Sequence, residues 1–294
     1  MQKTILVTGA NGQLGKSLQQ IAPDYAEQFR FLFTDVDTLD ITDLAAVRRM
    51  VQAENVDFLI NAAAYTAVDK AESDVEFAYL LNEKAVGNLA AAAKEHGTFF
   101  VHVSTDYVFD GKSDRPYKTT DTPNPTSVYG SSKLAGETAL RQSGCRGAIV
   151  RTAWLYSPYG NNFVKTMLRL ADTKESINVV SDQTGCPTLA LDLARFIMTV
   201  IEHDGAAEGV KCYHFTNKGR ITWYDFASEI IRQYGKNCPV HPIPTSSYPT
   251  PATRPAFSVL DLTESDSIFA IPDWKESLTQ VLPEIIHNYK NNIF

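Results

Sequence analysis

The stretch Gly9-Ala10-Asn11-Gly12-Gln13-Leu14-Gly15 decides the fold, because it joins a strand to a helix through three glycines spaced three residues apart. The apolar run Lys3–Val7 before it predicts a strand, and Gln13–Ile21 predicts a helix that opens inside the motif. Such glycines permit a tight turn, close approach of the backbone to a pyrophosphate, and close packing of helix on strand. The helix N-terminus then offers free N–H groups to the phosphates. A bare tight turn would also use glycines, but the order strand, turn and helix favours a dinucleotide site.

Strand-like and helix-like segments alternate through the first half of the chain. The strand runs are continuously apolar, which indicates a sheet covered by helices on both faces. Repeated β-α-β order implies right-handed crossovers, so the sequence predicts an α/β fold with a Rossmann-like, doubly wound parallel sheet. The further expected strands are Phe29–Asp35, Phe58–Asn61, Thr98–Ser104 and Gly147–Trp154, and the expected helices are Leu44–Ala53, Ser73–His96 and Tyr129–Ser143.

The alternation loosens after residue 155, where we expect helices at Phe163–Leu170, Leu189–Glu202 and Trp223–Tyr234 and a strand at Cys212–Thr216. Pro239–Pro255 holds six prolines, which excludes a helix or a central strand. It could be a disordered linker, but its aromatic and apolar flanks favour an ordered loop over a cleft. We therefore expect an NAD(P)-binding domain over residues 1–154 and a smaller, mainly substrate-binding lobe over 155–294, with a segment near 211–217 free to rejoin the first sheet.

Composition narrows the class of protein. The 294 residues are 44% hydrophobic and 21% charged, with a formal net charge of −7, which is typical of a globular protein and argues against nucleic-acid or membrane surfaces. The N-terminal apolar run is too short for a signal peptide, and the sequence holds no apolar run long enough to span a membrane. The cysteines lie at least 26 residues apart without clustered histidines, so we expect neither disulfides nor a metal site and a cytoplasmic location.

Asp35 stands at the end of the second expected strand, 20 residues after Gly15. A carboxylate at this place accepts hydrogen bonds from an adenosine ribose and repels a 2′-phosphate. Val36-Asp37-Thr38 supply no cation for such a phosphate, so the residues alone lean toward NADH. A solvated loop aspartate is the alternative interpretation. Asp40-Ile41, and the small residues of Asn61-Ala62-Ala63-Ala64-Tyr65, mark further places where a cofactor could contact the chain.

Tyr129 and Lys133 lie four residues apart at the start of an expected helix, so they share one helix face. A nearby ammonium stabilises a phenolate, and we expect it to bring the pKa of this tyrosine toward the working range of an acid–base catalyst. Ser104-Thr105-Asp106 ends a strand 24 residues earlier, where a hydroxyl could bind a substrate carbonyl beside the tyrosine. These motifs in this order indicate an oxidoreductase.

At this point the sequence resembles the extended short-chain dehydrogenases/reductases, and within them the dTDP-4-dehydrorhamnose reductase family. The resemblance runs from residue 5 to about 262. The blocks that carry it are Ser104–Gly111, Val128–Gly130 with Lys133–Glu137, Arg151–Tyr156, Asn161-Asn162-Phe163, Asp182–Thr188, and Tyr248–Ala252 with Arg254-Pro255.

The resemblance implies reduction, by NADPH or NADH, of the C4 keto group of a dTDP-linked 6-deoxysugar in dTDP-rhamnose and polysaccharide biosynthesis. It implies catalysis by Thr105, Tyr129 and Lys133, and a sugar site lined by Thr105, Asp106 and Trp154, with Arg254 of the Pro-rich loop over the nucleotide. Trp154 could instead be core packing. The cofactor residues expected from motif and resemblance are Gly9, Gly12, Gln13, Leu14, Gly15, Asp35, Asp40, Ile41, Ala64, Tyr65, Thr66, Tyr129 and Lys133.

Two departures and two alternatives accompany this interpretation. Dehydratase relatives carry Thr-Asp-Glu, whereas this chain has Thr105-Asp106-Tyr107, which disfavours dehydration. The first helix reads Lys16-Ser17-Leu18-Gln19-Gln20, without the carboxylates that some relatives use at a metal-containing dimer contact, so the metal is not expected and a homodimer stays open. A nucleotide-sugar epimerase, and a non-catalytic regulatory subunit like the β-subunit of methionine adenosyltransferase, are the alternative functions.

Overall fold

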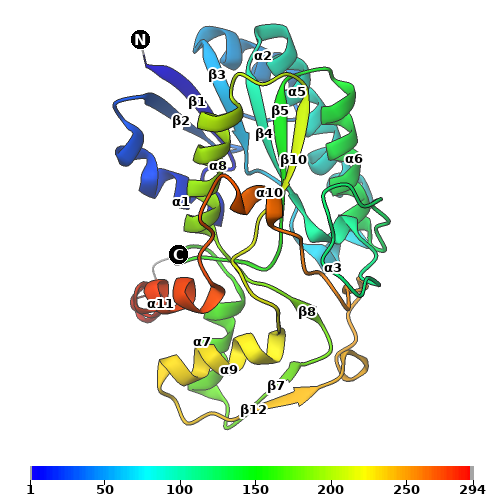
Figure 1. Cartoon of the computed structure of the whole chain (residues 1–294), viewed down its shortest axis with the longest axis vertical. Coiled ribbons are helices and arrows are strands. Elements are labelled where there is room, and N and C mark those ends of the chain that lie inside the picture. Colours follow the sequence, from blue (N-terminus) through cyan, green and yellow to red (C-terminus); the bar gives the residue numbers. More distant parts are fainter. Residues whose placement is uncertain (1, 292–294) are drawn as a thin grey trace.

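A six-stranded parallel sheet forms the larger part of the molecule in this computed structural model, which describes residues 2–291 (Figure 1). Its strand order is β10-β5-β4-β3-β1-β2, so the chain changes direction of winding between β1 and β3. The prediction of a doubly wound parallel sheet is confirmed. The strands are β1 (Lys3–Thr8), β2 (Phe29–Thr34), β3 (Val56–Asn61), β4 (Phe99–Thr105), β5 (Gly147–Thr152) and β10 (Val210–His214).

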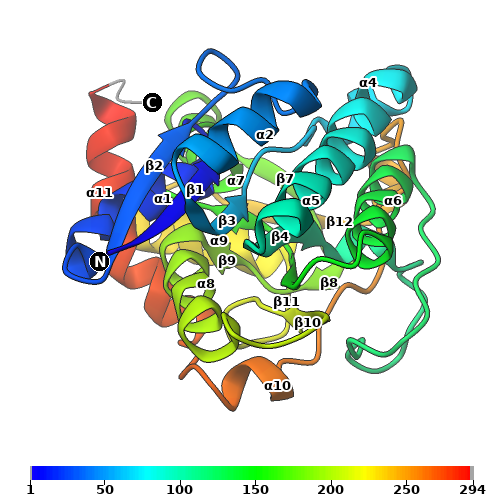
Figure 2. The ribbon, with the colours of Figure 1, turned by 90° about the horizontal axis from the view of Figure 1, so that it is seen from above.

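Helices cover both faces of this sheet, as its apolar strands require (Figure 2). On one face α1 (Gln13–Ile21) packs beside α8 (Ala190–Asp204), and their apolar sides meet Val7, Ile60 and Val150. On the other face α2 (Leu44–Ala53), α5 (Ala85–His96) and α6 (Val128–Gln142) lie side by side. Both α8 and β10 belong to the second half of the chain, so that half contributes to the first sheet.

The second lobe lies below the carboxyl ends of the sheet in Figure 1 and has a core of its own. Three helices supply most of it: α7 (Phe163–Thr173), α9 (Trp223–Tyr234) and α11 (Trp274–Lys290). The short strand pairs are β6 (Leu155–Tyr156) with β9 (Thr188–Leu189), β7 (Ile177–Val180) with β12 (Val240–Ile243), and β8 (Thr184–Gly185) with β11 (Ile221–Thr222). Within the Pro-rich segment, β12 is thus a strand of a two-stranded ribbon, where Pro242 is tolerated.

The expected single helix Ser73–His96 is interrupted in the structure. It consists of α4 (Val75–Tyr79), a π-helical turn over Leu80–Lys84, and α5. The turn directs Asn82 inward, where its amide bonds both the N–H and the carbonyl of Tyr65 and also Ser132. A π turn of this kind often marks a functional site. Here the turn holds the segment after β3 through Asn82. The apolar periodicity of the sequence could not reveal this interruption of the helix.

The remaining short elements lie in the connections between the longer helices and strands. The strand expected over Cys212–Thr216 begins two residues earlier, because Val210 already pairs with Gly147. None of the helices in the described part of the chain is both long and apolar enough to cross a membrane. The short elements are α3 (Val68–Ala71), α10 (Thr263–Asp266), and 3₁₀ turns over Ala22–Tyr25, Asp106–Val108 and Thr245–Ser247.

Candidate active site

A cavity of about 890 Å³ opens at the carboxyl ends of β1 to β5, between the sheet and the second lobe. This is the place where open α/β sheets bind ligands, beside the point where the strand order reverses. Most of the predicted site residues line it: Gly9, Gly12, Gln13, Leu14, Asp35, Asp40, Ile41, Ala64, Thr66, Thr105, Asp106, Tyr129, Lys133 and Trp154. Gly15, Tyr65 and Arg254 are not part of its wall; the backbone of Tyr65 is instead held by Asn82.

The glycine turn is shaped so tightly that side chains would not fit at two of its positions. Gly9 has a φ of +72°, and a Cβ there would lie 2.5 Å from the backbone nitrogen of Ala63. A Cβ on Gly15 would lie 2.3 Å from the carbonyl oxygen of Gly9, so Gly15 allows the helix to pack rather than touching the cavity. Helix α1 follows Gly12 without a side-chain N-cap, which leaves its first N–H groups available to an anion. The cradle therefore fits a pyrophosphate.

Asp35 lines the part of the cavity beside the glycine turn, whereas Thr105 and Trp154 line the part where the sugar is expected. Its carboxylate accepts hydrogen bonds from the N–H groups of Asn11 and Val36, at 2.8 Å each. Asp40 accepts from the N–H and hydroxyl of Thr42, which lowers the pKa of this carboxyl. Both side chains are thus fixed as acceptors at the edge where an adenosine would lie. The neighbouring Phe77, exposed and also lining the cavity, could not be singled out from the sequence.

Gln13 connects the cradle to the second lobe. Its side-chain oxygen accepts hydrogen bonds from the hydroxyl of Ser157 (3.0 Å) and the amide of Asn162 (3.1 Å). Asn162 also caps α7 by accepting from the N–H of Lys165. The same loop brings Gly160 and Asn161 to the cavity wall. The motif around Asn161 was the only sequence signal for this contact between the lobes.

Thr105, Asp106 and Tyr129 lie together in the cavity wall. The Thr105 hydroxyl donates to Asp106 Oδ1 at 2.9 Å, and its proximity lowers the pKa of Tyr129 against the larger effect of burial. Burial raises the pKa of Asp106 to about 6, against hydrogen bonds from Thr105 and Ser258. Burial also raises the pKa of Tyr129 to about 12. The structure thus differs from the expected lowering of this pKa: the phenol is held protonated at neutral pH, the form that can donate a proton.

Lys133 lies one helical turn after Tyr129, and its stem is buried at 2% exposure. Its Nζ atom donates to the carbonyl oxygen of Val103 in β4 at 2.7 Å. Burial lowers the pKa of Lys133 to about 8, with Glu137 acting in the opposite direction. The strand bond explains why this ammonium does not lower the pKa of Tyr129: it is oriented toward β4, although both residues face the cavity.

Trp154 stands where β5 leaves the sheet, with a φ of +49° that few non-glycine residues adopt. Its ring stacks on Trp223 of α9, with ring centroids 3.6 Å apart. It also lines the cavity, so it is at once packed against the second lobe and exposed to a ligand. The stack shows that Trp154 packs against the second lobe, and its role in a sugar site stays a prediction.

Arg254 binds the protein rather than facing the cavity. Its guanidinium pairs with Asp69 of α3 at 2.6 Å, and Asp69 also accepts from the N–H of Ala252. Burial raises the pKa of Tyr107, and the nearby charge of Arg254 acts in the opposite direction. Through Asp69, the end of the Pro-rich segment is thus held against α3.

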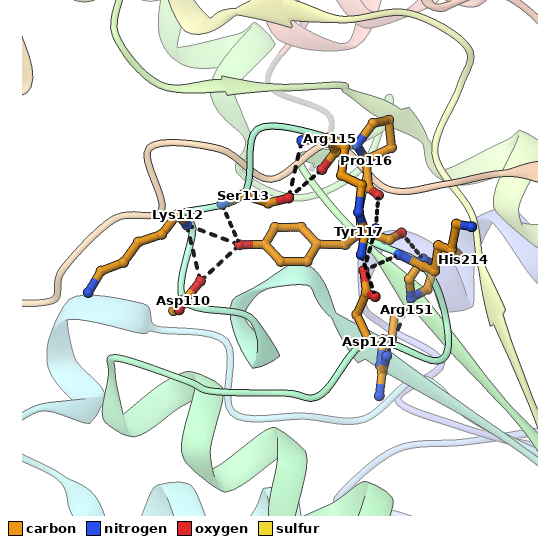
Figure 3. Close-up of polar contacts among 10 residues, drawn as sticks. Asp110, Lys112, Ser113, Arg115, Pro116, Tyr117, Asp121, Arg151 and His214 are labelled. Atoms are coloured by element: carbon orange, nitrogen blue, oxygen red, sulfur yellow. Dashed lines mark hydrogen bonds and ion pairs between the residues drawn. The ribbon is translucent and has the colours of Figure 1, made fainter.

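The loop after this turn is fastened by Tyr117 (Figure 3). Its hydroxyl accepts from the N–H groups of Lys112 and Ser113 and donates to Asp110. Its carbonyl oxygen accepts from His214 Nδ1 at 3.0 Å, and Arg151 lies beside that ring. The loop is thus anchored to β10.

Most of the chain matches known proteins. Residues 2–286 match the family model described as the RmlD substrate binding domain. A dTDP-4-dehydrorhamnose reductase of Aggregatibacter actinomycetemcomitans is 43% identical over 287 residues, 94% of this chain and 97% of the relative. The chain belongs to the dTDP-4-dehydrorhamnose reductase family.

Two solved structures of this family agree with the fold. The reductase ortholog from Clostridium acetobutylicum superposes with a TM-score of 0.90 at 43% identity, covering 95% of this chain and 98% of that one. The reductase of Bacillus anthracis, solved in complex with NADP, gives a TM-score of 0.91 at 38% identity, with 97% and 100% covered. The family resemblance inferred from the sequence blocks is confirmed.

Proposed function

We propose that this protein is a dTDP-4-dehydrorhamnose reductase, which uses NADPH or NADH to reduce the C4 keto group of dTDP-4-dehydro-6-deoxy-L-mannose to dTDP-L-rhamnose. The observation that carries the proposal is one continuous cavity, lined at one end by the glycine cradle and at the other by Thr105, Tyr129, Lys133 and Trp154. Family membership supplies the substrate. The reaction is an oxidoreduction within dTDP-rhamnose biosynthesis.

The residues around the cavity fit a nicotinamide dinucleotide. Gly9, Gly12 and the first turn of α1 would hold the pyrophosphate, and Asp35 and Asp40 the adenosine. Gln13, Leu14, Ile41, Ala64 and Thr66 would complete the cofactor wall, while Gly15 and Tyr65 support it from behind. A reduced nicotinamide bound in the cavity supplies the hydride.

Tyr129 would act as the general acid. Its phenol is protonated at neutral pH because burial raises its pKa to about 12, and it can therefore give a proton to the oxygen at C4. Thr105, which lines the same cavity and influences the pKa of this hydroxyl, would orient the C4 oxygen. Lys133 would hold the ribose of the cofactor and return the proton to Tyr129 from solvent.

The sugar nucleotide would bind between the two lobes. Trp154 and Asp106 line the sugar end of the cavity, and Arg254 acts from outside it by fastening the Pro-rich segment near Tyr107. On this basis we keep the division into a dinucleotide-binding domain, 1–154, and a mainly substrate-binding lobe, 155–294; residue 1 and residues 292–294 lie outside the described residues. The second half nevertheless supplies β10 and α8 to the sheet.

We further propose that NADH is the better cofactor. A 2′-phosphate would lie near the Asp35 carboxylate, and Val36-Asp37-Thr38 bring no cation to offset the repulsion. The relative from Bacillus anthracis was solved with NADP, so the two cofactors need a direct comparison. A cytoplasmic location fits the four free cysteines, and a metal-free homodimer is the oligomeric state we would test by light scattering.

The experiment is absorbance at 340 nm with purified protein, dTDP-4-dehydrorhamnose, and NADH or NADPH in parallel. Oxidation of one cofactor per sugar reduced would establish the reductase and rank the two cofactors. Sugar conversion without net cofactor oxidation would point to the epimerase. Bound cofactor without any turnover would point to the regulatory subunit.

A further inference from the structure

A chain of buried polar side chains runs behind Lys133. Asn61 belongs to the motif Asn61–Tyr65 noted in the sequence, but none of these side chains has a role in the proposed function. Thr8 ends β1, Asn61 ends β3 and His102 lies in β4, so three neighbouring strands supply it. Each of these side chains is at most 1% exposed. A buried polar group is costly unless it is hydrogen-bonded, so each bond in this chain has a definite donor and acceptor.

The backbone fixes the orientation of the Asn61 amide. The N–H of Ala63 donates to Asn61 Oδ1 at 3.1 Å, and the Thr8 hydroxyl donates to the same oxygen at 2.7 Å. A backbone N–H can only donate, so the oxygen faces Ala63 and the NH₂ group faces His102. The Asn61 Nδ2 atom then donates to His102 Nδ1 over 3.1 Å.

This bond decides the tautomer of His102. Because Nδ1 accepts, the hydrogen of a neutral ring must be on Nε2. Burial, together with the charge of Lys133, lowers the pKa of His102 well below its usual range, so the ring is neutral. Its Nε2–H group faces Lys133 Nζ at 3.5 Å.

Lys133 is therefore placed between an acceptor and a donor. The carbonyl oxygen of Val103 accepts from Nζ at 2.7 Å, which either form of the lysine satisfies. An ammonium would turn a hydrogen toward the Nε2–H group of His102, whereas a neutral amine offers it a lone pair. The geometry favours the amine.

We propose that His102 is a positioning residue for the reduction: held in its Nε2–H tautomer by Asn61, it makes the ammonium of Lys133 a stronger acid and so a better source of the proton that restores Tyr129. The proposal rests on the proposed function for its catalytic meaning. The donor–acceptor chain itself does not depend on it.

The other charged groups around this pair do not replace His102. On α6, Glu137 favours the ammonium, but Arg151 of β5 and the Ser104 hydroxyl of β4 already bind its carboxylate at 2.6–2.8 Å. Tyr129 is a neutral phenol and Asp106 lies beyond Thr105. Burial lowers the pKa of Lys133. Of the described groups, His102 is the one that in addition directs an N–H toward Lys133 Nζ.

The first test reads the tautomer directly in the unmodified protein, by ¹⁵N NMR of histidine-labelled protein from pH 5.5 to 9. We expect a neutral Nε2–H ring for His102, assigned by its loss in H102L. His214 is an internal reference, because its Nδ1 faces the carbonyl oxygen of Tyr117 and it must be the opposite tautomer (Figure 3). An Nδ1–H or charged ring at His102 would overturn the proposal.

The second test measures the titration of Lys133 by its ¹³Cε signal in lysine-labelled protein, assigned with K133M. H102L removes the N–H donor without adding charge, and we expect the midpoint to rise by about one pH unit. N61D places an acceptor beside His102 Nδ1 and so forces the ring hydrogen onto Nδ1. This variant should raise the Lys133 midpoint further. H241L, which removes an imidazole from β12 in the second lobe, should leave the midpoint unchanged. An unmoved midpoint in both H102L and N61D would overturn the proposal, and N61D decides alone if H102L does not fold.

Turnover separates this inference from the proposed function. In an active enzyme, the alkaline limb of kcat should move up with the Lys133 midpoint in H102L and N61D, while the KM of the sugar changes little. Turnover with an unmoved limb would overturn the catalytic role of His102 and leave the reductase intact. If the unmodified protein does not reduce the sugar, the proposed function fails, and the two NMR tests still decide the tautomer and its effect on Lys133.

Discussion

The Thr105 hydroxyl donates its hydrogen to Asp106 Oδ1 over 2.9 Å, inside the cavity wall. Thr105 also lowers the pKa of Tyr129 against burial, so one hydroxyl lies between the proposed general acid and a buried carboxyl. A Thr105 hydroxyl that binds a substrate carbonyl must first leave Asp106. The buried carboxyl therefore influences both the stability of the site and the freedom of Thr105.

Asp106 should make the protein less stable as pH rises. Its pKa is raised from 3.8 to about 6, so the folded state binds more protons than the unfolded state between these values. Stability is then highest below 3.8 for this group, falls through that interval, and stays low above it. At pH 8 we expect D106N to have a free energy of unfolding higher than that of the original protein by on the order of 2 kcal/mol, measured by urea unfolding. The advantage should vanish at pH 4; an equal difference at both pH values would contradict the buried-carboxyl interpretation.

Replacement of Tyr129 by phenylalanine should remove the proton donor. We expect kcat to fall by about 10²- to 10⁴-fold, the usual worth of a general acid, while the cofactor dissociation constant changes by less than about threefold. Steady-state rates and fluorescence titration measure the two quantities. Y234F, at a tyrosine whose hydroxyl bonds Asp172 in the second lobe, is the matched control and should keep full turnover. Comparable losses in both variants would point to a folding defect.

Asp35 should control the choice of cofactor. D35N removes the charge but keeps an acceptor for the N–H of Asn11. Loss of one repulsive charge near a 2′-phosphate is worth about 1.4 kcal/mol or more, so the ratio of kcat/KM for NADPH to that for NADH should rise at least about tenfold. D37N changes a neighbouring carboxylate that does not line the cavity, and its ratio should match the original protein. An unchanged ratio in D35N would place the ribose contact elsewhere.

Gly15 should tolerate no side chain. The Cβ of G15A would lie 2.3 Å from the carbonyl oxygen of Gly9, so the turn must move. Overpacking of this kind costs about 1–3 kcal/mol, and we expect a lower Tm together with cofactor binding weakened at least about tenfold. G87A is the matched control: the nearest atom to its Cβ would be Ala139 Cβ at 3.9 Å, and alanine suits the helix interior. Similar binding by G15A and the original protein would show that the cradle adapts.

Sequence reasoning was strongest where chemistry is local. The glycine turn, Asp35 at the end of β2, and the pairing of Tyr129 with Lys133 follow from spacing, because a strand or helix fixes which neighbours share a face. It was weaker for the pKa of Tyr129, which depends on how deeply the phenol is buried and on where the Lys133 ammonium is oriented. It could not reveal the ion pair of Arg254 with Asp69, because the two residues are 185 positions apart in the chain; the expected role of Arg254 at the nucleotide stays a prediction.

The sequence by itself determined the order of strands and helices, the phosphate cradle and the family, because these depend on residue types at short, regular intervals. Only the tertiary structure decided which groups meet across strands and lobes: Trp154 on Trp223, Gln13 with Ser157, and His102 between Asn61 and Lys133. The physical reason is that hydrogen bonds and burial act over a few ångströms in space. Residues that share such a distance can be any number of positions apart in the chain.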